Sequence, residues 1–422
     1  MCNRTYQDII AHLNLTSKKD LSMTRPAKNA AEPTEVELAV LLYAILEVKE
    51  KEQEFVSYVW VDLLWVDNHI QWIPGDFCGI QEMCLPTGLV WKPDLTIEEM
   101  TEKDKATQSP YFCITYLGKI LLREDMVLIT TCKMQVYKFP FDFQRCNLSF
   151  KSVIHDVRKI MFVPYGDSNS TTQWSQEKIR TQSDWLFINI TLNAKTVHNF
   201  EINQSMIVYT ITMKRRSVLY IVNFILPILM FLGLDLSSFL ISERGGEKLS
   251  FKVTVLLAVT VMQLILNEIL PSSSDRIPLI AIYCIGIFGL MMLSLLETIL
   301  VMFLMEKDSA SQDNEEDKDQ GLSCDASSGD TSSELMQVAK EGRSSRLTEE
   351  SLDSLKEEMK SLSLSLSSKK KQEQTGYWTR MAKKLNNIFF LCYVITTGLF
   401  LSFMFYSWAE EENEKPMYSA YF

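Results

Sequence analysis

Four long apolar segments constrain this chain more than any other feature of its sequence. They run over residues 218–241, 249–270, 278–305 and 388–408. A helix needs about 20 apolar residues to cross the hydrocarbon core of a bilayer, and each segment is long enough. A single soluble core rarely contains four such helices, so we predict four membrane crossings. The mean hydropathy of +0.00 hides this division, because the polar and apolar residues lie in separate segments.

Glycosylation sequons indicate which side of the membrane the first polar region occupies. Six sequons occur, and they begin at Asn3, Asn14, Asn147, Asn169, Asn189 and Asn203. None follows Arg216, and such sites are expected on the surface of secreted segments. We therefore predict a glycoprotein whose N-terminus is extracellular. Four crossings then bring the C-terminus back to the extracellular side.

Basic residues near the crossings agree only in part with this topology. Lys383 and Lys384 precede the last crossing on the cytosolic side, as the positive-inside rule requires, whereas the basic run 214–216 lies outside. We retain the sequon-based orientation and predict a multi-pass plasma membrane protein. No basic and apolar leader follows Met1, so we expect that a leader has been removed or that the natural N-terminus is missing.

The extracellular region is predicted to be an all-β sandwich. Seven segments are rich in β-branched and aromatic residues: 35–48, 56–66, 112–122, 126–136, 147–154, 185–192 and 206–213. No helical pattern lies between them, which favours a sandwich, and residues 7–15 are expected to form a short helix ahead of it. In the cytosolic region, residues 308–330 are acidic, Ser-rich and predicted to be disordered, whereas residues 347–381 have helical spacing.

Five domains follow from these patterns. They are an extracellular β-sandwich (1–216), a bundle with the first three crossings (217–305), a cytosolic loop with a membrane-associated helix (306–386), the fourth crossing (387–408) and an extracellular tail (409–422).

The nine cysteines fall into distinct groups. Cys132 and Cys146 enclose thirteen residues in the oxidising compartment, and a disulfide that closes such a loop is worth about 3 kcal/mol. Taken alone, this pair indicates only a structural link. Cys78, Cys84 and Cys113 allow one further bridge and one remaining thiol, and their pairing stays open. The cysteines in apolar or cytosolic segments are expected to be free thiols: Cys284, Cys324 and Cys392.

The second apolar segment carries a polar stripe. Six residues recur at steps of four and three: Ser250, Thr254, Leu257, Val261, Leu264 and Glu268. At about 100° per residue they fall within roughly 80° of one helix face. Hydroxyl and carboxylate groups are costly inside a bilayer unless they face water or protein. Several copies around an axis would line a pore, with Leu257 and Val261 as a dewetting constriction; the alternative is that the stripe joins helices within one bundle.

Charges at the ends of the stripe predict cation selectivity. Glu247 precedes the segment and Glu268 closes it, so a ring of copies would place carboxylates at both mouths. Such rings attract cations and repel anions. Lys248 partly offsets Glu247, so selectivity depends on which of the two faces the axis. The alternative is that these charges only anchor the helix at the membrane interface.

Several motifs together resemble the pentameric Cys-loop ligand-gated ion channels. The loop motif consists of Phe139, Pro140, Phe141 and Asp142. Four crossings follow it, and Pro227 lies in the first. Residues 58–60, 91–94, 246–254 and 278–280 are most similar to the type 3 serotonin receptor branch. The resemblance implies a homo- or hetero-pentamer with related subunits, an agonist site between extracellular domains and a pore lined by the second crossing. It also implies that the Cys loop and Pro278 meet where agonist binding is relayed to the gate.

The implied agonist site departs from the family pattern on its principal face. Trp60 and Trp91 match two aromatic segments of a cation-binding box, and Glu99 matches an acidic residue beside it. Val153 stands where a Trp is expected, and Gln204 where a Tyr is expected. The alternative interpretation of both tryptophans is that they are plain core residues of the sandwich.

The opposing face departs from the pattern as well. Its candidate ligand-binding residues are Asp62, Tyr111 and Arg123. Asp62 stands where the family has a basic residue, and Cys113 and Arg123 stand where it has tyrosines. As a homopentamer, this subunit is therefore expected to bind serotonin poorly or not at all.

Three functional hypotheses remain open. The first is a cation-conducting subunit of the serotonin type 3 branch, in a plasma membrane such as the postsynaptic one. Serotonin or another amine would be its agonist. Monovalent cations and calcium would pass through its pore, and membrane lipid would surround its crossings. An accessory role, in which partner subunits supply the aromatic face, belongs to this hypothesis. The second keeps the architecture but uses a metal ion, a proton or a different amine as the ligand. The third is a membrane receptor or adhesion protein without conduction.

Other classes of function find no support in the residues. The four histidines, at 12, 69, 155 and 198, lack metal-ligand spacing, so no metal site and no cofactor are predicted. A net charge of -11 argues against a nucleic-acid partner. The sequence contains no Gly-rich loop that would bind phosphate and no recognisable combination of a nucleophile with a base. We therefore do not predict an enzyme.

Overall fold

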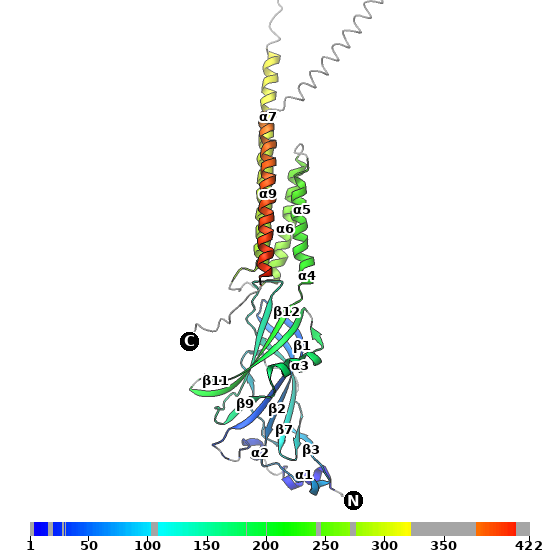
Figure 1. Ribbon diagram of the computed structural model, residues 1–422, viewed down its shortest axis with the longest axis vertical. Coiled ribbons are helices and arrows are strands. Elements are labelled where there is room, and N and C mark those ends of the chain that lie inside the picture. The colour runs from blue at the N-terminus through cyan, green and yellow to red at the C-terminus, as the bar shows by residue number, and fades with distance from the viewer. Residues whose placement is uncertain are drawn as a thin grey trace, which may run out of the picture. The chain divides into compact units, whose positions relative to one another are not determined.

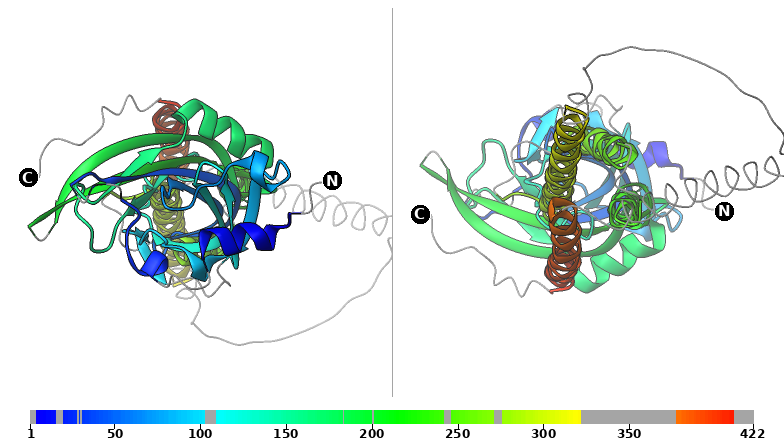
Figure 2. Two further views of the ribbon diagram at one scale, coloured as in Figure 1. Left: turned by 90° about the horizontal axis from the view of Figure 1, so that it is seen from below. Right: turned by 90° about the horizontal axis from the view of Figure 1, so that it is seen from above.

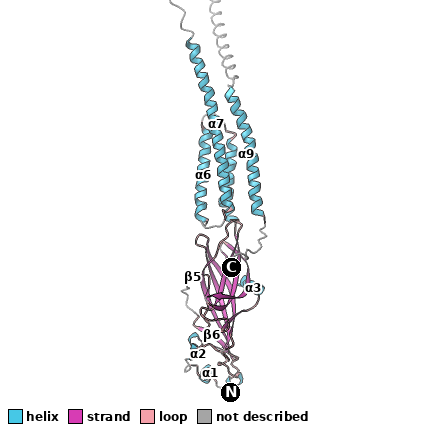
Figure 3. Ribbon diagram, turned by 90° about the vertical axis from the view of Figure 1, so that its left-hand side faces the viewer, coloured by secondary structure: helices cyan, strands magenta, loops and turns pink. Residues whose placement is uncertain are grey.

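The chain folds into a β-rich unit and a helical unit, which are described one at a time. The computed structural model describes residues 4–15, 20–27, 29, 31–102, 109–182, 184–199, 201–241, 246–270, 276–321 and 377–410. The first unit combines Met1–Ile228, Val261–Cys284 and Tyr406–Phe422, and the second combines Leu229–Thr260 and Ile285–Phe405. Strands belong to the N-terminal half of the chain and long helices to the C-terminal half (Figure 3).

Two sheets form the sandwich of the first unit (Figure 1). The larger has the order β10-β1-β2-β7-β6-β3, with β5 paired to β7 and β9 paired to β1. Its strands are β1 (Thr34–Lys49), β2 (Glu54–Val66), β3 (Glu82–Pro86), β5 (Met100–Glu102), β6 (Tyr111–Thr115), β7 (Lys119–Thr131), β9 (Ile160–Pro164) and β10 (Thr181–Gln182). The smaller has the order β11-β12-β8-β4, made of β4 (Thr96–Ile97), β8 (Phe143–Lys151), β11 (Trp185–Asn199) and β12 (Ile202–Arg215). The predicted all-β sandwich is confirmed.

Alternating burial along the strands forms the core of the sandwich. In β2, the side chains of Phe55, Val59 and Leu63 are fully buried, whereas the residues between buried positions are half-exposed. Successive side chains of a strand point to opposite faces, so this alternation marks a sheet with one packed face. Tyr209 on β12 crosses the core, with its ring against Phe150 and its hydroxyl donating to a main-chain carbonyl of β1 at 2.8 Å. That hydrogen bond offsets the cost of burying the hydroxyl.

The structure divides two of the predicted strand segments differently. The segment 112–122 is divided by a turn at Gly118, where φ is +78°. A Cβ at this position would lie 2.2 Å from the carbonyl oxygen of Asp67, so the turn requires glycine. The segment 126–136 ends as a strand at Thr131, because the chain there enters the Cys132–Cys146 loop.

Helix α3 (Ser168–Lys178) contradicts the expectation that no helix lies between the strands. Asp167 caps its first turn and accepts a hydrogen bond from the Ser170 amide at 2.9 Å. The helix joins the two sheets, because Ser175 accepts from an amide of β1 and Thr172 accepts from an amide of β11. The predicted N-terminal helix is present as α1 (Tyr6–Leu13). Shorter elements are α2 (Asp20–Met23) and two 3-10 helices, Pro74–Phe77 and Thr87–Leu89.

Among the described residues, four helices are long and apolar enough to cross a membrane: Val218–Ser238, Glu247–Ile269, Leu279–Lys307 and Tyr377–Ala409. The first consists of α4 (Val218–Tyr220), a π-helical turn (Ile221–Ile225) and α5 (Leu226–Ser238). Pro227 follows that turn and has no amide hydrogen to donate, and a wider turn is one way to accommodate a proline. The others are α6 (Glu247–Ile269), α7 (Leu279–Gly321) and α9 (Tyr377–Ala409).

Helix α7 corrects one further expectation. Disorder was predicted from residue 308, yet the helix continues to Gly321. The extension contains no proline and several good helix formers, so a helix that is already nucleated continues through it. Residues 322–376 lie outside the described part of the chain, as does most of the helix predicted for 347–381.

A buried polar cluster joins the four helices within the second unit. Figure 2 shows the ribbons of these helices along their length, without side chains. Asp235 on α5 accepts hydrogen bonds from Tyr393 on α9 at 2.7 Å and from Ser294 on α7 at 3.2 Å. Lys252 on α6 lies 4.0 Å from the Asp235 carboxylate and donates to the Ser294 carbonyl at 3.0 Å. Phe239 lies under the ammonium group, 4.2 Å from ring centre to nitrogen. Polar groups inside a membrane bundle need such partners.

Replacing Asp235 by leucine should destabilise the helical unit by about 3–5 kcal/mol, because Lys252 then loses its nearest carboxylate while it remains buried. Tyr393→Phe removes one hydrogen bond only and should cost about 1–2 kcal/mol. Thermal unfolding of the purified chain in detergent, followed by size-exclusion chromatography, measures both. Equal melting temperatures for the two variants would contradict this ranking.

Candidate ligand-binding and coupling sites

The outer face of β2 presents aromatic and acidic side chains to solvent. Tyr58, Trp60 and Asp62 share this face because alternate residues of a strand point the same way. The Trp60 ring stacks on Tyr43 with 5.0 Å between ring centres. The Tyr58 hydroxyl donates to Asp125 at 2.7 Å, and this hydrogen bond raises the pKa of Tyr58. Trp60 is half-exposed, so it is not a core residue.

Asp62 and Arg123 form an ion pair on the same face. They stand directly opposite each other on β2 and β7. Arg123 donates to both carboxylate oxygens, from Nε at 2.9 Å and from a terminal nitrogen at 2.8 Å. The hydrogen bond that Arg123 donates to Asp62 raises the pKa of Arg123. Two of the positions predicted to bind ligand therefore neutralise each other within one chain.

Trp91 and Glu99 have mainly structural contacts. Trp91 is 7% exposed and packs edge to face on Trp65 in the sandwich interior. Both carboxylate oxygens of Glu99 accept hydrogen bonds from Ser149 on β8, one from the amide and one from the hydroxyl, each at 2.7 Å. The core interpretation of the two tryptophans thus holds for Trp91 and fails for Trp60.

The structure brings Val153 and Gln204 together. Gln204 is buried, and its amide nitrogen donates to the carbonyls of Ser152 at 3.0 Å and Val153 at 3.4 Å. Asp94 holds the same turn from the other side by accepting from the Ser152 hydroxyl and the Val153 amide, both at 2.8 Å. The Val153 side chain is 57% exposed. Where the family pattern has two aromatic rings, this chain has an exposed aliphatic group and a polar clamp.

Tyr111 is on β6, the strand next to β7 in the larger sheet. It is 58% exposed on β6, opposite Pro86 of the edge strand β3.

A buried arginine organises the end of the sandwich from which the first crossing begins. Arg215 ends β12, and its side chain is 0% exposed. It donates from Nε to Asp142 at 2.8 Å and from a terminal nitrogen to Glu50 at 2.7 Å, while its plane covers Trp185 at 4.2 Å. Burial alone lowers the pKa of Arg215, but attraction by Asp142 and Glu50 outweighs that effect and the pKa is raised.

The loop closed by the Cys132–Cys146 disulfide contacts three of the long helices through residues of the first unit. Phe139 packs on Tyr220 with 4.9 Å between ring centres, and Phe141 packs on Trp408 at 6.0 Å. The peptide bond between Phe139 and Pro140 is cis. The carbonyl of Tyr137 accepts from the Leu279 amide at 2.8 Å, immediately after Pro278. The predicted coupling residues thus lie around a single loop.

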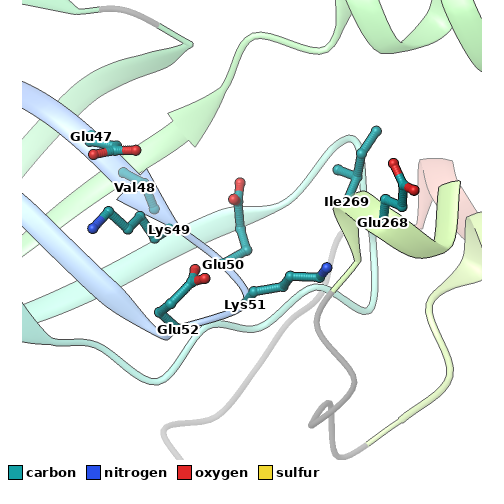
Figure 4. Close-up of a pocket in the computed structure, with 8 residues that line it drawn as sticks. All are labelled: Glu47, Val48, Lys49, Glu50, Lys51, Glu52, Glu268 and Ile269. Atoms are coloured by element: carbon teal, nitrogen blue, oxygen red, sulfur yellow. The ribbon is translucent and has the colours of Figure 1, made fainter. Parts of the chain in front are cut away.

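A cavity of about 460 Å³ lies between the β1–β2 loop and the end of α6 (Figure 4). Residues 47–52 line one side and Glu268 and Ile269 the other. Glu50 belongs to this wall and also to the Arg215 ion pair. The last carboxylate of the predicted pore stripe therefore lies near the loop that binds Arg215.

Helix α6 leaves its polar stripe uncovered within the single chain. Ser250, Thr254 and Glu268 are exposed, and the three aliphatic members are exposed by 48% to 64%. Glu247 is exposed as well, whereas the neighbouring Lys248 is buried. The Lys248 ammonium lies 5.1 Å from the ring centre of Phe239 and donates to Asn386 at 3.4 Å.

The sequons and cysteines occupy varied environments. Asn14, Asn169 and Asn203 are exposed, Asn147 and Asn189 are half-buried, and Asn3 lies outside the described residues. A second disulfide joins Cys84 to Cys113. Cys78 is also disulfide-bonded, so the expected leftover thiol is absent from these three. Cys284 and Cys392 are free, as predicted, and Cys324 lies outside the described residues.

Sequence reasoning missed the roles of Arg215 and Glu50. A signal was present, because the basic run 214–216 contradicted the positive-inside rule. An arginine that contradicts topology is a candidate for a buried ion pair.

Family comparisons agree with this architecture. The family model for the neurotransmitter-gated ion-channel ligand binding domain matches residues 13–217, and that for the neurotransmitter-gated ion-channel transmembrane region matches residues 224–323. The chain belongs to this family of ligand-gated channels, and the predicted resemblance is confirmed. Family membership also identifies the chain as a multi-pass membrane protein.

Curated relatives narrow the branch. The 5-hydroxytryptamine receptor 3A of Mus musculus is 31% identical over 305 residues, which cover 70% of this chain and 60% of the relative. The 5-hydroxytryptamine receptor 3E of Homo sapiens is 28% identical, with coverages of 67% and 61%. The 5-hydroxytryptamine receptor 3B of Homo sapiens is 25% identical, with coverages of 91% and 88%. The chain thus spans about three fifths of the length of the receptor 3A relative.

Removing the Asp142 carboxylate should leave Arg215 with one carboxylate partner in a buried position. Asp142→Ala is expected to cost about 3–5 kcal/mol and to reduce the amount of folded protein at the cell surface. Glu50→Ala should cost less, because Glu50 is partly solvated. Surface biotinylation and thermal unfolding check both variants, with the exposed Arg216→Ala as control. If Asp142→Ala kept the melting temperature and the surface level of the wild type, Asp142 would not be the partner that stabilises Arg215.

Proposed function

We propose that this chain is an accessory subunit of a cation-selective, pentameric channel of the type 3 serotonin receptor branch. Related subunits would complete its agonist site, and the second crossing would line its pore. The observation that carries this proposal is the uncovered stripe of α6, with carboxylates at its two ends and the neighbouring lysine buried. Family membership and the relatives named as 5-hydroxytryptamine receptors support the branch.

The exposure pattern of α6 supports a pore lined by this helix. Lys252, Val255 and Val259 are buried, while Ser250, Thr254 and the rest of the stripe are not. If the stripe only joined helices within one bundle, these hydroxyls and the carboxylate would be covered by the chain itself. Copies arranged around an axis would wet the hydroxyls and close the path at Leu257 and Val261 when the channel is shut.

The two charges at the cytosolic end of α6 support cation selectivity. Lys248 is withdrawn toward Phe239 and Asn386, so it does not neutralise Glu247 on the exposed face. A ring of Glu247 carboxylates at one mouth and Glu268 at the other would concentrate monovalent cations and calcium.

The agonist face supports the accessory role. A cation over an aromatic ring gains about 0.5 to 2 kcal/mol, but Val153 and Gln204 supply no ring and Trp91 is packed in the core. On the opposing face, Asp62 and Arg123 are bound to each other rather than available to a ligand. Two copies of this chain would therefore enclose an amine poorly, and a partner subunit would provide the missing rings.

Gating would pass through the loop around Phe139. Its contacts with Tyr220, Trp408 and Leu279 place one rigid, disulfide-closed segment against the starts or ends of three crossings. A shift of this loop would move those helix ends together.

Expressed alone, the chain should give no current in response to serotonin, and expressed with a receptor 3A subunit it should change the pore. Thr254→Cys should then make the current sensitive to a soluble thiol reagent, because this side chain would be wetted. Val255→Cys lies on the covered face and should stay insensitive. Whole-cell recording before and after the reagent tests both. Reaction at Val255→Cys with protection at Thr254→Cys would refute a pore lined by the stripe.

Neutralising the end charges should reduce selectivity. In the co-expressed channel, the double variant Glu247→Gln and Glu268→Gln is expected to shift the reversal potential toward the chloride equilibrium potential under a salt gradient. Lys248→Gln serves as control and should shift it little, because Lys248 is buried away from the exposed face. A double variant that keeps the wild-type reversal potential would remove the argument for charge rings.

A further inference from the structure

Three side chains with metal-binding chemistry meet at the free edge of the larger sheet. Strand β3 is the last strand of that sheet and pairs only with β6 along the described order. Glu82 and Cys84 are two residues apart on β3 and therefore share one face. Cys113 stands directly opposite Cys84 on β6. The carboxylate oxygen and the two sulfurs all lie within 4.8 Å of one another.

The Cys84–Cys113 disulfide differs from the Cys132–Cys146 disulfide in its access to solvent. Cys84 is exposed and Cys113 half-exposed. Cys132 and Cys146 are only 4% and 0% exposed. Thiol–disulfide exchange needs an attacking thiolate to reach a sulfur atom, so exposed bridges are the ones that are opened and reclosed. An external reductant would therefore open the Cys84–Cys113 bridge before the Cys132–Cys146 bridge.

The strand pairing should hold the two thiols together after the bridge is cut. Five register pairs join β3 to β6, from Glu82 opposite Thr115 to Pro86 opposite Tyr111. The Cα atoms of Cys84 and Cys113 are 4.0 Å apart. At this separation both sulfurs can bind one ion at the usual zinc–sulfur distance of about 2.3 Å.

We propose that reduction of the Cys84–Cys113 bridge creates a zinc site at this edge, held by two thiolates and the Glu82 carboxylate. A dithiol reductant supplies two electrons and two protons, is itself oxidised to a disulfide, and leaves Cys84 and Cys113 as thiols. Zinc then displaces one proton from each thiol, and water occupies the fourth position. The oxidised chain has no thiolate here and binds no zinc at this edge.

The ligand set selects the class of metal. Two thiolates and one carboxylate suit zinc or cadmium, whereas magnesium and calcium prefer oxygen ligands alone. The histidines play no part in the site, and sequence spacing could not reveal it, because Cys113 lies 29 residues from Cys84. Only the register of β3 against β6 brings the three groups together.

The site adjoins the opposing face of the implied agonist site. Cys113 occupies one of the positions that the family resemblance assigns to that face, and Tyr111 is two residues away on the same strand. Zinc bound here would leave the net charge beside Tyr111 unchanged, because the two thiol protons leave as the ion binds. The existence of the zinc site does not depend on the proposed channel function, and binding alone tests it.

The test uses the full chain purified in detergent. The protein is treated with dithiothreitol, desalted without oxygen, and titrated with zinc against a chromophoric chelator. Peptide mass spectrometry after alkylation first verifies that Cys84 and Cys113 are thiols and that Cys132 and Cys146 remain bridged. We expect one zinc ion per reduced chain and no binding at this site in the oxidised chain. Zinc should protect Cys84 and Cys113 from alkylation while leaving the exposed Cys392 reactive.

Variants assign the ligands. Glu82→Gln should weaken zinc binding by roughly tenfold or more, and Cys84→Ser with Cys113→Ser should abolish it. Glu102→Gln, an exposed carboxylate on β5, is the matched control and should leave affinity unchanged. With cadmium as the probe, thiolate-to-metal absorption should correspond to two sulfurs per ion.

Three outcomes would overturn the proposal. They are equal zinc uptake by the oxidised chain, uptake that survives the double serine substitution, and no uptake by a reduced chain whose circular dichroism shows intact strands.

Discussion

The neutralisation of Arg215 is the interaction on which the rest of the first unit depends. A buried guanidinium is tolerated only when carboxylates and aromatic faces surround it, and Arg215 finds them on four separate segments. Asp142 comes from the disulfide-closed loop, Glu50 from the β1–β2 loop, and Trp185 and Tyr220 from the start of β11 and of the first crossing. One charge thus holds together four segments at the end of the sandwich where the first crossing begins.

The helical unit also contains a buried cationic side chain that needs polar partners. Lys252 is buried beside Asp235, and Ser294 and Tyr393 complete the cluster so that no charge stands alone in an apolar environment. Withdrawal of Lys248 into the bundle has a further effect, because Glu247 stays exposed at the start of α6 without that lysine beside it. Packing of basic side chains inward therefore defines the electrostatics of the face that we assign to the pore.

At the positions of the implied agonist site, hydrogen bonds hold the backbone where the family pattern has aromatic side chains. Gln204 and Asp94 hold the Val153 turn with hydrogen bonds, so the turn keeps its place although the aromatic rings of the family pattern are missing. The Asp62–Arg123 pair likewise occupies the opposite strand positions with groups that satisfy each other. These contacts keep the sandwich folded without the aromatic rings, and they are the basis of the accessory role that we propose.

The sequence by itself determined the fold class, the four crossings, the Cys132–Cys146 bridge and the polar stripe of α6. Each of these is a local pattern, because apolar length, strand alternation, loop spacing and helical period can all be counted along the chain. Only the tertiary structure decided that Trp91 is core while Trp60 is not, that Lys248 turns away from Glu247, that Cys84 pairs with Cys113, and that Arg215 binds Glu50. These outcomes depend on which face of an element packs against which neighbour. Contacts between residues that are far apart in the chain produce no periodic pattern and no fixed spacing in the sequence.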